Sequence, residues 1–297
     1  MHTLAQMNPF GRPATRREFL AALAAGTLSA CGAAGASSTA PPRPQTPTRS
    51  PTSPAQPALP TPTTWRPSSG DIDPLAKLTA ARHIERVGTD AHHRVQVIEA
   101  QYGGLLTDTA SVLVVCRSWT LQGATLQEGG HTFDVRLARN AGGWVVTAVY
   151  PSTPGAATAR PTTAARHVLT NHRIVLPPAA RADVASGQVH DTALEAMLRM
   201  SRRWLVGVSV VRSGHPLYVF GTDRLSDHPQ GRAFDTWQID GHPVVDPRTS
   251  RALITSYMEA LADLGSYNVG GPVLLGSAPQ FFSDKTHHDH VHAGFSR

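Results

Sequence analysis

Two short segments near the C-terminal end of the chain combine His and Asp side chains, and they restrict how the chain can fold. The first, Ser-Asp-His-Pro-Gln-Gly-Arg-Ala-Phe-Asp, occupies residues 226–235, and the second, His-Asp-His-Val-His, occupies residues 288–292. His and Asp ligands together suit Zn²⁺, and three protein ligands leave a fourth tetrahedral position open for water. The segments therefore predict a zinc site of the catalytic type, which forms only if the fold brings them together.

The spacing within each segment predicts local geometry. His228 and Asp235 are an odd number of residues apart, so one straight strand would point them to opposite faces. The chain must therefore bend between them, and Gly231 is the residue that allows a bend. His290 and His292 are two residues apart, so on a strand both imidazoles face the same way. We expect two imidazoles on one side of a sheet, with the first segment completing the ligand shell.

The two segments resemble a known group of zinc peptidases. The pattern Ser-x-His-x-x-Gly-x-Ala-x-Asp matches at all five fixed positions, and His-x-His follows far downstream. This resembles the group that contains lysostaphin, the D-Ala-D-Ala metallopeptidases and hedgehog, and within it peptidase family M15. The resemblance implies a zinc metallopeptidase, a D-alanyl-D-alanine carboxypeptidase or a related endopeptidase, whose substrates are peptidoglycan peptides.

The resemblance also implies roles for individual residues. In these families the second His of His-x-His binds the metal, so the predicted zinc ligands are His228, Asp235 and His292. The other histidine, His290, would polarise the bound water or stabilise the oxyanion. Some members use a Glu three residues before the last ligand as general base. Asp289 occupies that place here and is the second catalytic candidate.

The segment upstream departs from the family pattern. M15 proteins have Ser-Gly-Tyr-Arg there, and the Arg helps to hold the substrate carboxylate, but residues 213–216 read Ser-Gly-His-Pro. Arg224 or Arg232 could replace the missing Arg, and Ser226 is a further candidate for substrate binding. Because the Arg and the Glu are both missing, the alternative is a catalytically inactive zinc-containing domain that binds cell-wall peptides.

The N-terminus has the features of an export signal. Residues 15–20, Thr-Arg-Arg-Glu-Phe-Leu, have the twin-arginine pattern, and the mildly apolar segment after them is too short to span a bilayer. Leu-Ser-Ala-Cys-Gly at residues 28–32 resembles a lipobox with Cys31 as the lipidated residue. An ordinary signal peptide with an incidental Cys is the alternative. We expect residues 1–31 to be a twin-arginine lipoprotein signal, with the mature chain lipid-anchored on the outer face of the cell membrane.

Composition divides the rest of the chain. Residues 32–73 consist largely of Ala, Ser, Thr and Pro, which cannot bury enough apolar surface to become ordered, and they predict a disordered stalk.

The net charge of the chain is +6, but the Arg residues are spread along the chain, so we expect no nucleic-acid partner. Attraction to anionic lipid or cell-wall polymer is compatible with this charge. The sequence does not indicate an oligomeric state.

Residues 74–150 predict a small α+β module, and residues 151–161 a linker. A helix is expected at 75–87, and strands at 111–116, 131–137 and 143–150, with a hairpin turn at 140–143. Helix plus curled antiparallel sheet resembles NTF2-like or cystatin-like modules. Cys116 in the first of these strands is predicted to be a buried, inert thiol.

Residues 162–297 predict the peptidase-like domain, an α+β fold with helices packed on one antiparallel sheet that carries the metal. The expected elements are helices at 165–169 and 179–186, a helix capped by Asp191, a strand at 205–211, a helix from Asp246-Pro247 to Gly265, and strands at 272–275 and 290–295.

Overall fold

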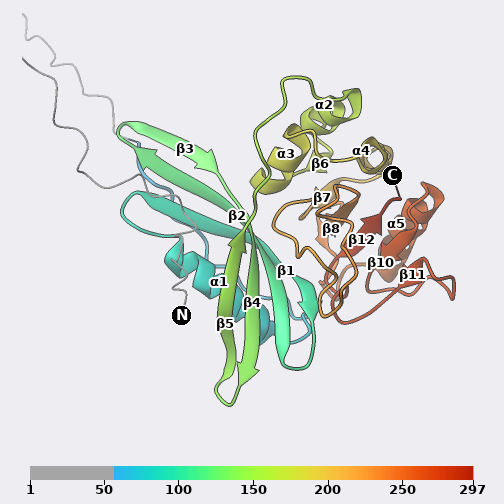
Figure 1. The fold of residues 1–297 in the computed structure, drawn as a ribbon, viewed down its shortest axis with the longest axis horizontal. Helices are drawn as coiled ribbons and strands as arrows, with labels where there is room; N and C mark the ends of the chain where they lie inside the picture. Colours follow the sequence, from blue (N-terminus) through green and yellow to red (C-terminus); the bar gives the residue numbers. More distant parts are fainter. Residues whose placement is uncertain (1–56, 297) are drawn as a thin grey trace, which may run out of the picture. The chain divides into compact units, whose positions relative to one another are not determined.

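Two β-sheets organise the part of the chain that the structure, a computed structural model, describes, residues 57–296 (Figure 1). The predicted signal with Cys31, and the first part of the predicted stalk, lie outside the described residues. Helices accompany both sheets, which confirms the general α+β class. Within residues 57–296, no helix has the length and apolar character that crossing a bilayer requires.

The first sheet is antiparallel and forms what we call the N-terminal module, residues 74–151. Its elements are α1 (Pro74–Val87), β1 (His93–Leu105), β2 (Thr109–Gln122), β3 (Thr125–Gly129), β4 (Thr132–Asn140) and β5 (Gly143–Pro151). The strand order is β1-β2-β4-β5, with β3 paired to β2, and α1 lies against the sheet (Figure 1). The predicted helix and three strands are confirmed. Sequence analysis missed β1 and β3, and β1 has two register shifts that break simple alternation.

Two local predictions in this module are confirmed. Asn140 and Gly143 pair across the end of β4 and β5, and the Gly142 N–H donates to the Asn140 side chain at 2.8 Å. Cys116 is a free thiol and is 1% exposed. Burial raises the pKa of this thiol well above its ordinary value, which keeps it protonated and unreactive.

The predicted stalk ends earlier than residue 73. The Thr63 backbone exchanges two hydrogen bonds with the Gln96 side chain, each 2.7 Å long. The Trp65 N–H donates to Glu85 at 2.8 Å. Composition indicated disorder because this segment has few large apolar side chains, but backbone hydrogen bonds to α1 and β1 hold it instead.

The second sheet belongs to what we call the C-terminal module, residues 163–296. Its elements are α2 (Thr163–Thr170), β6 (Ile174–Val175), α3 (Pro178–Ala185), α4 (Asp191–Ser201), β7 (Val206–Val208), β8 (Ala233–Ile239), β9 (His242–Pro243), α5 (Arg251–Asp263), β10 (Asn268–Gly270), β11 (Phe281–Phe282) and β12 (Val291–Gly294). The order is β11-β10-β12-β8-β7-β6, and β9 pairs with β8. The prediction of one antiparallel sheet was wrong at both ends, where β6–β7 and β10–β11 are parallel. A crossover connection in each case returns the chain in the same direction.

Two helices differ from their predicted starts. The helix expected from Asp246 begins at Arg251, because Asp246 opens a turn in which the Thr249 N–H donates to its carbonyl at 2.8 Å. Asp191 is the first residue of α4 and not its cap. Its carboxylate instead accepts a hydrogen bond of 2.6 Å from the Thr162 hydroxyl.

Two strands also differ. The strand predicted at 205–211 is reduced to β7, in which a register shift between Gly207 and Val208 makes the pairing with β8 irregular. Residues 272–275 form no strand, and β10 lies just before them. The helices α4 and α5 cover the sheet with a continuous apolar core, in which the rings of Trp204 and Tyr257 meet edge to face at 5.2 Å. This packing holds β8 and β12, the two strands that carry the predicted ligands.

Candidate metal centre

Strand register and one glycine turn bring the predicted ligands together. Asp235 in β8 lies directly opposite His292 in β12, so their side chains share one face of the sheet. His228 reaches the same face because the chain reverses at Gly231, which has a φ of +72°. The Gly231 N–H donates to the His228 carbonyl at 2.8 Å, and a β-carbon at this glycine would lie 2.1 Å from the Gln188 carbonyl oxygen. The predicted bend is confirmed.

Three donor atoms converge at this point. His228 Nε2 lies 3.1 Å from Asp235 Oδ1 and 3.1 Å from His292 Nδ1, and the last two atoms are 3.0 Å apart. Zinc bonds of roughly 2.0–2.1 Å place two ligand atoms of a tetrahedron about 3.3 Å apart. A small outward shift of each side chain would therefore accommodate the ion, and the donor set of two imidazoles and one carboxylate fits zinc chemistry.

The surroundings of the three ligands favour metal binding. His228 Nδ1 lies 2.8 Å from the Val211 carbonyl, an acceptor, so this nitrogen carries the proton and Nε2 is left with its lone pair. Burial lowers the pKa of His292 to about 4, so its ring is neutral at neutral pH. Burial would raise the pKa of Asp235, but the facing imidazoles of His228 and His290 outweigh it and hold that pKa well below its ordinary value. Neutral imidazoles and an ionised carboxylate are the states that bind zinc.

His290 and Asp289 form a buried pair beside the three ligands. His290 precedes β12, and its Nδ1 lies 2.5 Å from Asp289 Oδ1. Its Nε2 lies 3.8 Å from Asp235 Oδ2. The ring is therefore next to the three converging donor atoms but does not contribute one of them. The other Asp289 oxygen accepts from the Tyr102 N–H at 3.0 Å and from Lys77 at 2.6 Å. Because both oxygens of Asp289 are occupied, it is poorly placed to act as a general base.

A fourth histidine, His215, was missed as a site residue. Its ring is stacked on that of His228 at a centroid distance of 4.2 Å, and one of its nitrogens lies within 4.8 Å of the His228 and Asp235 ligand atoms. Its Nδ1 contacts the Pro216 carbonyl at 3.0 Å and the Ser226 hydroxyl at 3.3 Å. The shorter distances favour His292 over His215 as the third donor. The only sequence signal for His215 is its place in the run that replaces Ser-Gly-Tyr-Arg.

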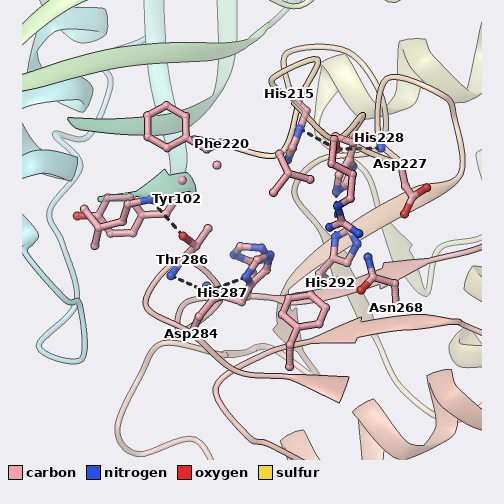
Figure 2. Close-up of a pocket in the computed structure, with 18 of the residues that line it drawn as sticks. Tyr102, His215, Phe220, Asp227, His228, Asn268, Asp284, Thr286, His287 and His292 are labelled. Carbon is pink, nitrogen blue, oxygen red and sulfur yellow. Dashed lines mark hydrogen bonds and ion pairs between the residues drawn. The ribbon is translucent and has the colours of Figure 1, made fainter. Parts of the chain in front are cut away.

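His228 and His292, two of the predicted ligands, line a cleft of about 570 Å³ (Figure 2). Two of the predicted substrate-binding residues, Ser226 and Arg224, line this cleft, and so does Lys285, which sequence analysis did not identify. Arg232 does not line it. Its guanidinium is bonded to Asp227 at 3.2 Å and to neighbouring oxygens, so its predicted role in substrate binding has no support here.

Strand β1 of the N-terminal module lines the same cleft. Residues 102–106 contribute to its lining, and Figure 2 shows Tyr102 across the cleft from His228 and His292. Sequence analysis did not predict that the N-terminal module reaches the site.

A second group of possible ligands, Asp71, His288 and Asp289, lies nearby. The ammonium group of Lys77 is completely buried among them and pairs with both Asp71 and Asp289. A cation of the protein itself therefore occupies the position between these carboxylates, and we assign no metal to this group.

Comparison of the chain with known protein families, with curated proteins and with solved structures found no match.

Proposed function

We propose that the chain is a zinc metallopeptidase of the M15-like type that hydrolyses peptide bonds in peptidoglycan stem peptides. The observation that carries the proposal is the convergence of one donor atom each of His228, Asp235 and His292 within 3.1 Å of one another, beside a cleft that the two histidines line. Lipidation at Cys31 would anchor the protein outside the cell membrane, where these peptides occur. The resemblance in residues 226–235 and 288–292 supports the substrate class.

The residues around His228, Asp235 and His292 suit peptide hydrolysis. Zinc bound by the three ligands would act as a Lewis acid that polarises a carbonyl and lowers the pKa of water. Asp289 holds His290 by its Nδ1, which leaves Nε2 free to donate a proton or a hydrogen bond to the reacting group. His290 also lines the cleft, so this nitrogen can reach a bound peptide.

The cleft can take a peptide that carries a carboxylate. Its volume lies within the range of roughly 300–1,000 Å³ typical of small-ligand sites. Arg224 and Lys285 supply two cations along its wall, either of which could replace the Arg missing from residues 213–216. Asp227 and Asp284 supply negative charge in the same cleft. Both carboxypeptidase and endopeptidase action agree with this distribution.

The second candidate function is an inactive zinc-containing domain that binds wall peptides. The observation that favours it is that both carboxylate oxygens of Asp289 already have partners, namely His290, Lys77 and a backbone N–H. If the general base must come from this position, the site binds peptides and does not cleave them.

Metal analysis and peptide hydrolysis of three variants test the proposal. We expect about one zinc per chain in the wild type and in His290→Ala, and loss of most zinc in His292→Ala, since a two-ligand site is far weaker. Hydrolysis of muropeptides, followed by mass spectrometry, should fall by about 10²- to 10⁴-fold in His290→Ala. The exposed His167→Ala is the matched control and should behave as wild type.

Two outcomes contradict the proposal. If His290→Ala loses zinc and His292→Ala retains it, the ligand and the catalytic residue are exchanged. If the wild type binds zinc and muropeptides but releases no product, the second candidate function is correct.

A further inference from the structure

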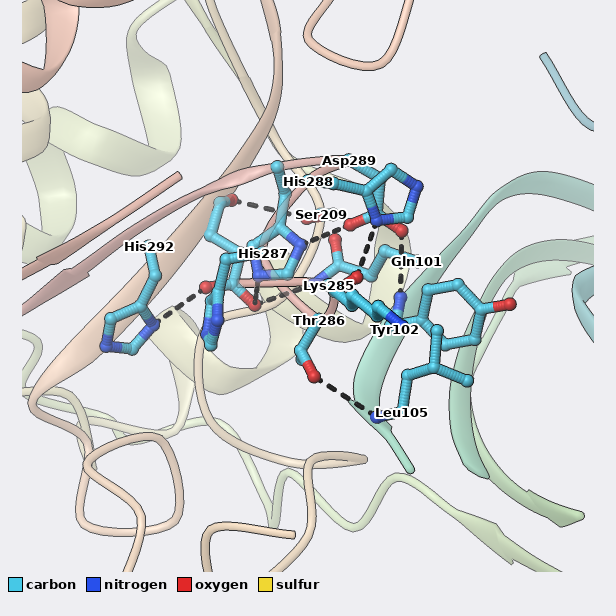
Figure 3. Close-up of polar contacts among 12 residues, drawn as sticks. Gln101, Tyr102, Leu105, Ser209, Lys285, Thr286, His287, His288, Asp289 and His292 are labelled. Atoms are coloured by element: carbon cyan, nitrogen blue, oxygen red, sulfur yellow. Dashed lines mark hydrogen bonds and ion pairs between the residues drawn. The ribbon is translucent and has the colours of Figure 1, made fainter. Parts of the chain in front are cut away.

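The N-terminal module meets the metal centre along the free edge of strand β1. In the first sheet β1 pairs only with β2, so its outer edge carries backbone groups that need other partners. The Tyr102 N–H donates to Asp289 Oδ2 at 3.0 Å, and the Leu105 N–H donates to the Thr286 hydroxyl at 3.1 Å (Figure 3). The segment just before β12 therefore provides acceptors for two N–H groups of this edge and holds β1 beside the predicted ligands.

Gln101 extends from this edge to a metal ligand. Its side chain is 0% exposed, and its Nε2 donates to Asp235 Oδ2 at 2.7 Å. The other Asp235 oxygen, Oδ1, faces His228 and His292. Gln101 thus holds the carboxylate in a rotation in which Oδ1 alone faces the two imidazoles, so a metal held there would meet a single carboxylate oxygen.

The neighbours of Gln101 keep it in place. Alternation along the strand points the Tyr102 side chain to the opposite face, where its hydroxyl donates to the carbonyls of Ile72 and Asp73 at 3.0 Å and 2.8 Å. The buried Lys77 of α1 pairs with Asp289, which also accepts from the Tyr102 N–H. These contacts attach β1 to residues 72–73 on one face and to Asp289 at its edge, so the Gln101 amide is preorganised.

A role in packing alone does not explain an amide at this position. The Gln101 carbonyl oxygen, Oε1, is buried and has no hydrogen-bond partner among the described residues. An unpaired buried acceptor is destabilising, and an apolar side chain of the same size would avoid it. The amide is useful here because its N–H orients Asp235.

We propose that Gln101, supplied by the N-terminal module, is a positioning residue of the metal centre that keeps Asp235 bound through one oxygen, an inference that rests on the function proposed above. The N-terminal module is then a part of the site and not only a spacer between membrane and peptidase. Partners of this kind around a metal ligand typically contribute about 10- to 100-fold in metal affinity.

The test compares full-length variants by metal affinity and by the visible absorption of the cobalt-substituted protein. Gln101→Leu and Gln101→Met remove the donor and keep the volume. We expect zinc affinity, measured by competition with a chromophoric chelator, to fall by about 10- to 100-fold in both. The Co²⁺ absorption should weaken, because a carboxylate free to rotate binds through both oxygens and raises the coordination number.

Thr286→Val is the matched control. It removes a hydrogen bond between the same two segments, that to the Leu105 N–H. Among the described residues, the other hydrogen bond of Thr286 goes from its backbone N–H to Asp284, not to His228, Asp235 or His292. Its zinc affinity should stay within about twofold of wild type, since a contact that only docks the module does not orient Asp235. Equal losses in Thr286→Val and the Gln101 variants would mean that docking, not orientation, maintains the metal, and would overturn the inference.

The remaining outcomes are also decisive. Wild-type affinity and an unchanged Co²⁺ spectrum in both Gln101 variants refute the positioning role and leave the proposed function intact. Loss of the near-ultraviolet circular dichroism of the folded chain in both variants assigns Gln101 to the core and refutes the role as well. Failure of the wild type to bind zinc or cobalt refutes the proposed function itself, which is a separate result.

Discussion

The carboxyl group of Glu99 lies in a buried charge network, and its replacement by an amide should change how stability depends on pH. Glu99 belongs to β1, and the charged groups around it are Lys77, Asp289 and Asp71. Burial raises the pKa of Glu99 to about 8, against the effect of Lys77, while the two carboxylates raise it further. The folded protein therefore keeps this proton at neutral pH.

The size of the effect follows from the two pKa values. An unfolded Glu titrates near 4.5, so between that pH and about 8 the folded state binds more protons than the unfolded state. The contribution of Glu99 to the free energy of unfolding is therefore fully present below the pKa of the unfolded chain. It falls as the pH rises through this window, by about 1.4 kcal/mol per pH unit. Between about pH 5 and about pH 8 the loss amounts to roughly 3 kcal/mol after the curved ends of the titration are included.

Guanidinium denaturation of the full chain at several pH values measures this loss. Glu99→Gln does not titrate, so the difference in unfolding free energy between this variant and wild type should grow by about 3 kcal/mol from about pH 5 to about pH 8. Chelator in all samples removes the metal, and the pH dependence of other groups cancels in the difference. Glu259→Gln, at an exposed position, is the control and should show no such growth. A difference that stays constant with pH would refute the burial argument.

Two further predictions concern other parts of the chain. Gly104→Ala would place a β-carbon 2.1 Å from the Phe220 side chain and should lower stability by about 1–3 kcal/mol in denaturant, whereas Gly129→Ala, with its nearest contact at 3.8 Å, should change it little. Equal effects of the two would contradict the clash. Cys31→Ala should abolish lipid labelling and release the protein from the membrane fraction, and unchanged attachment of this variant would refute the predicted lipid anchor.

Local patterns predicted much of the C-terminal module, and they failed where structure depends on distant contacts. The bend at Gly231 was predicted because the odd spacing of His228 and Asp235 requires one and glycine has the backbone freedom to make it, and the residue has a positive φ. The start of α5 was placed too early because Asp246-Pro247 has the composition of a helix cap, yet the same residues also suit the turn that they form. The parallel ends of the sheet depend on crossover connections, which no local periodicity reports.

The candidate site shows the same division among its residues. His228, Asp235 and His292 were selected by donor chemistry and by the resemblance, and the structure places their ligand atoms together. Arg232 was selected by its position next to the motif, but its side chain turns to Asp227. Donor chemistry and the resemblance therefore selected side chains that the structure brings together, whereas position next to the motif did not predict that Arg232 would lie away from the cleft.

The sequence by itself determined the donor set and the local turn, because ligand type and backbone freedom are properties of individual residues. Only the tertiary structure decided that Gln101 orients Asp235 and that Lys77 occupies the space between two carboxylates. Gln101 and Asp235 are 134 residues apart, and their contact exists because the free edge of one sheet meets the ligand-bearing strand of another. The sequence pattern of β1 does not show which buried polar side chain will find a hydrogen-bond partner. A buried polar group costs free energy unless it is hydrogen-bonded, and only the tertiary fold supplies that partner.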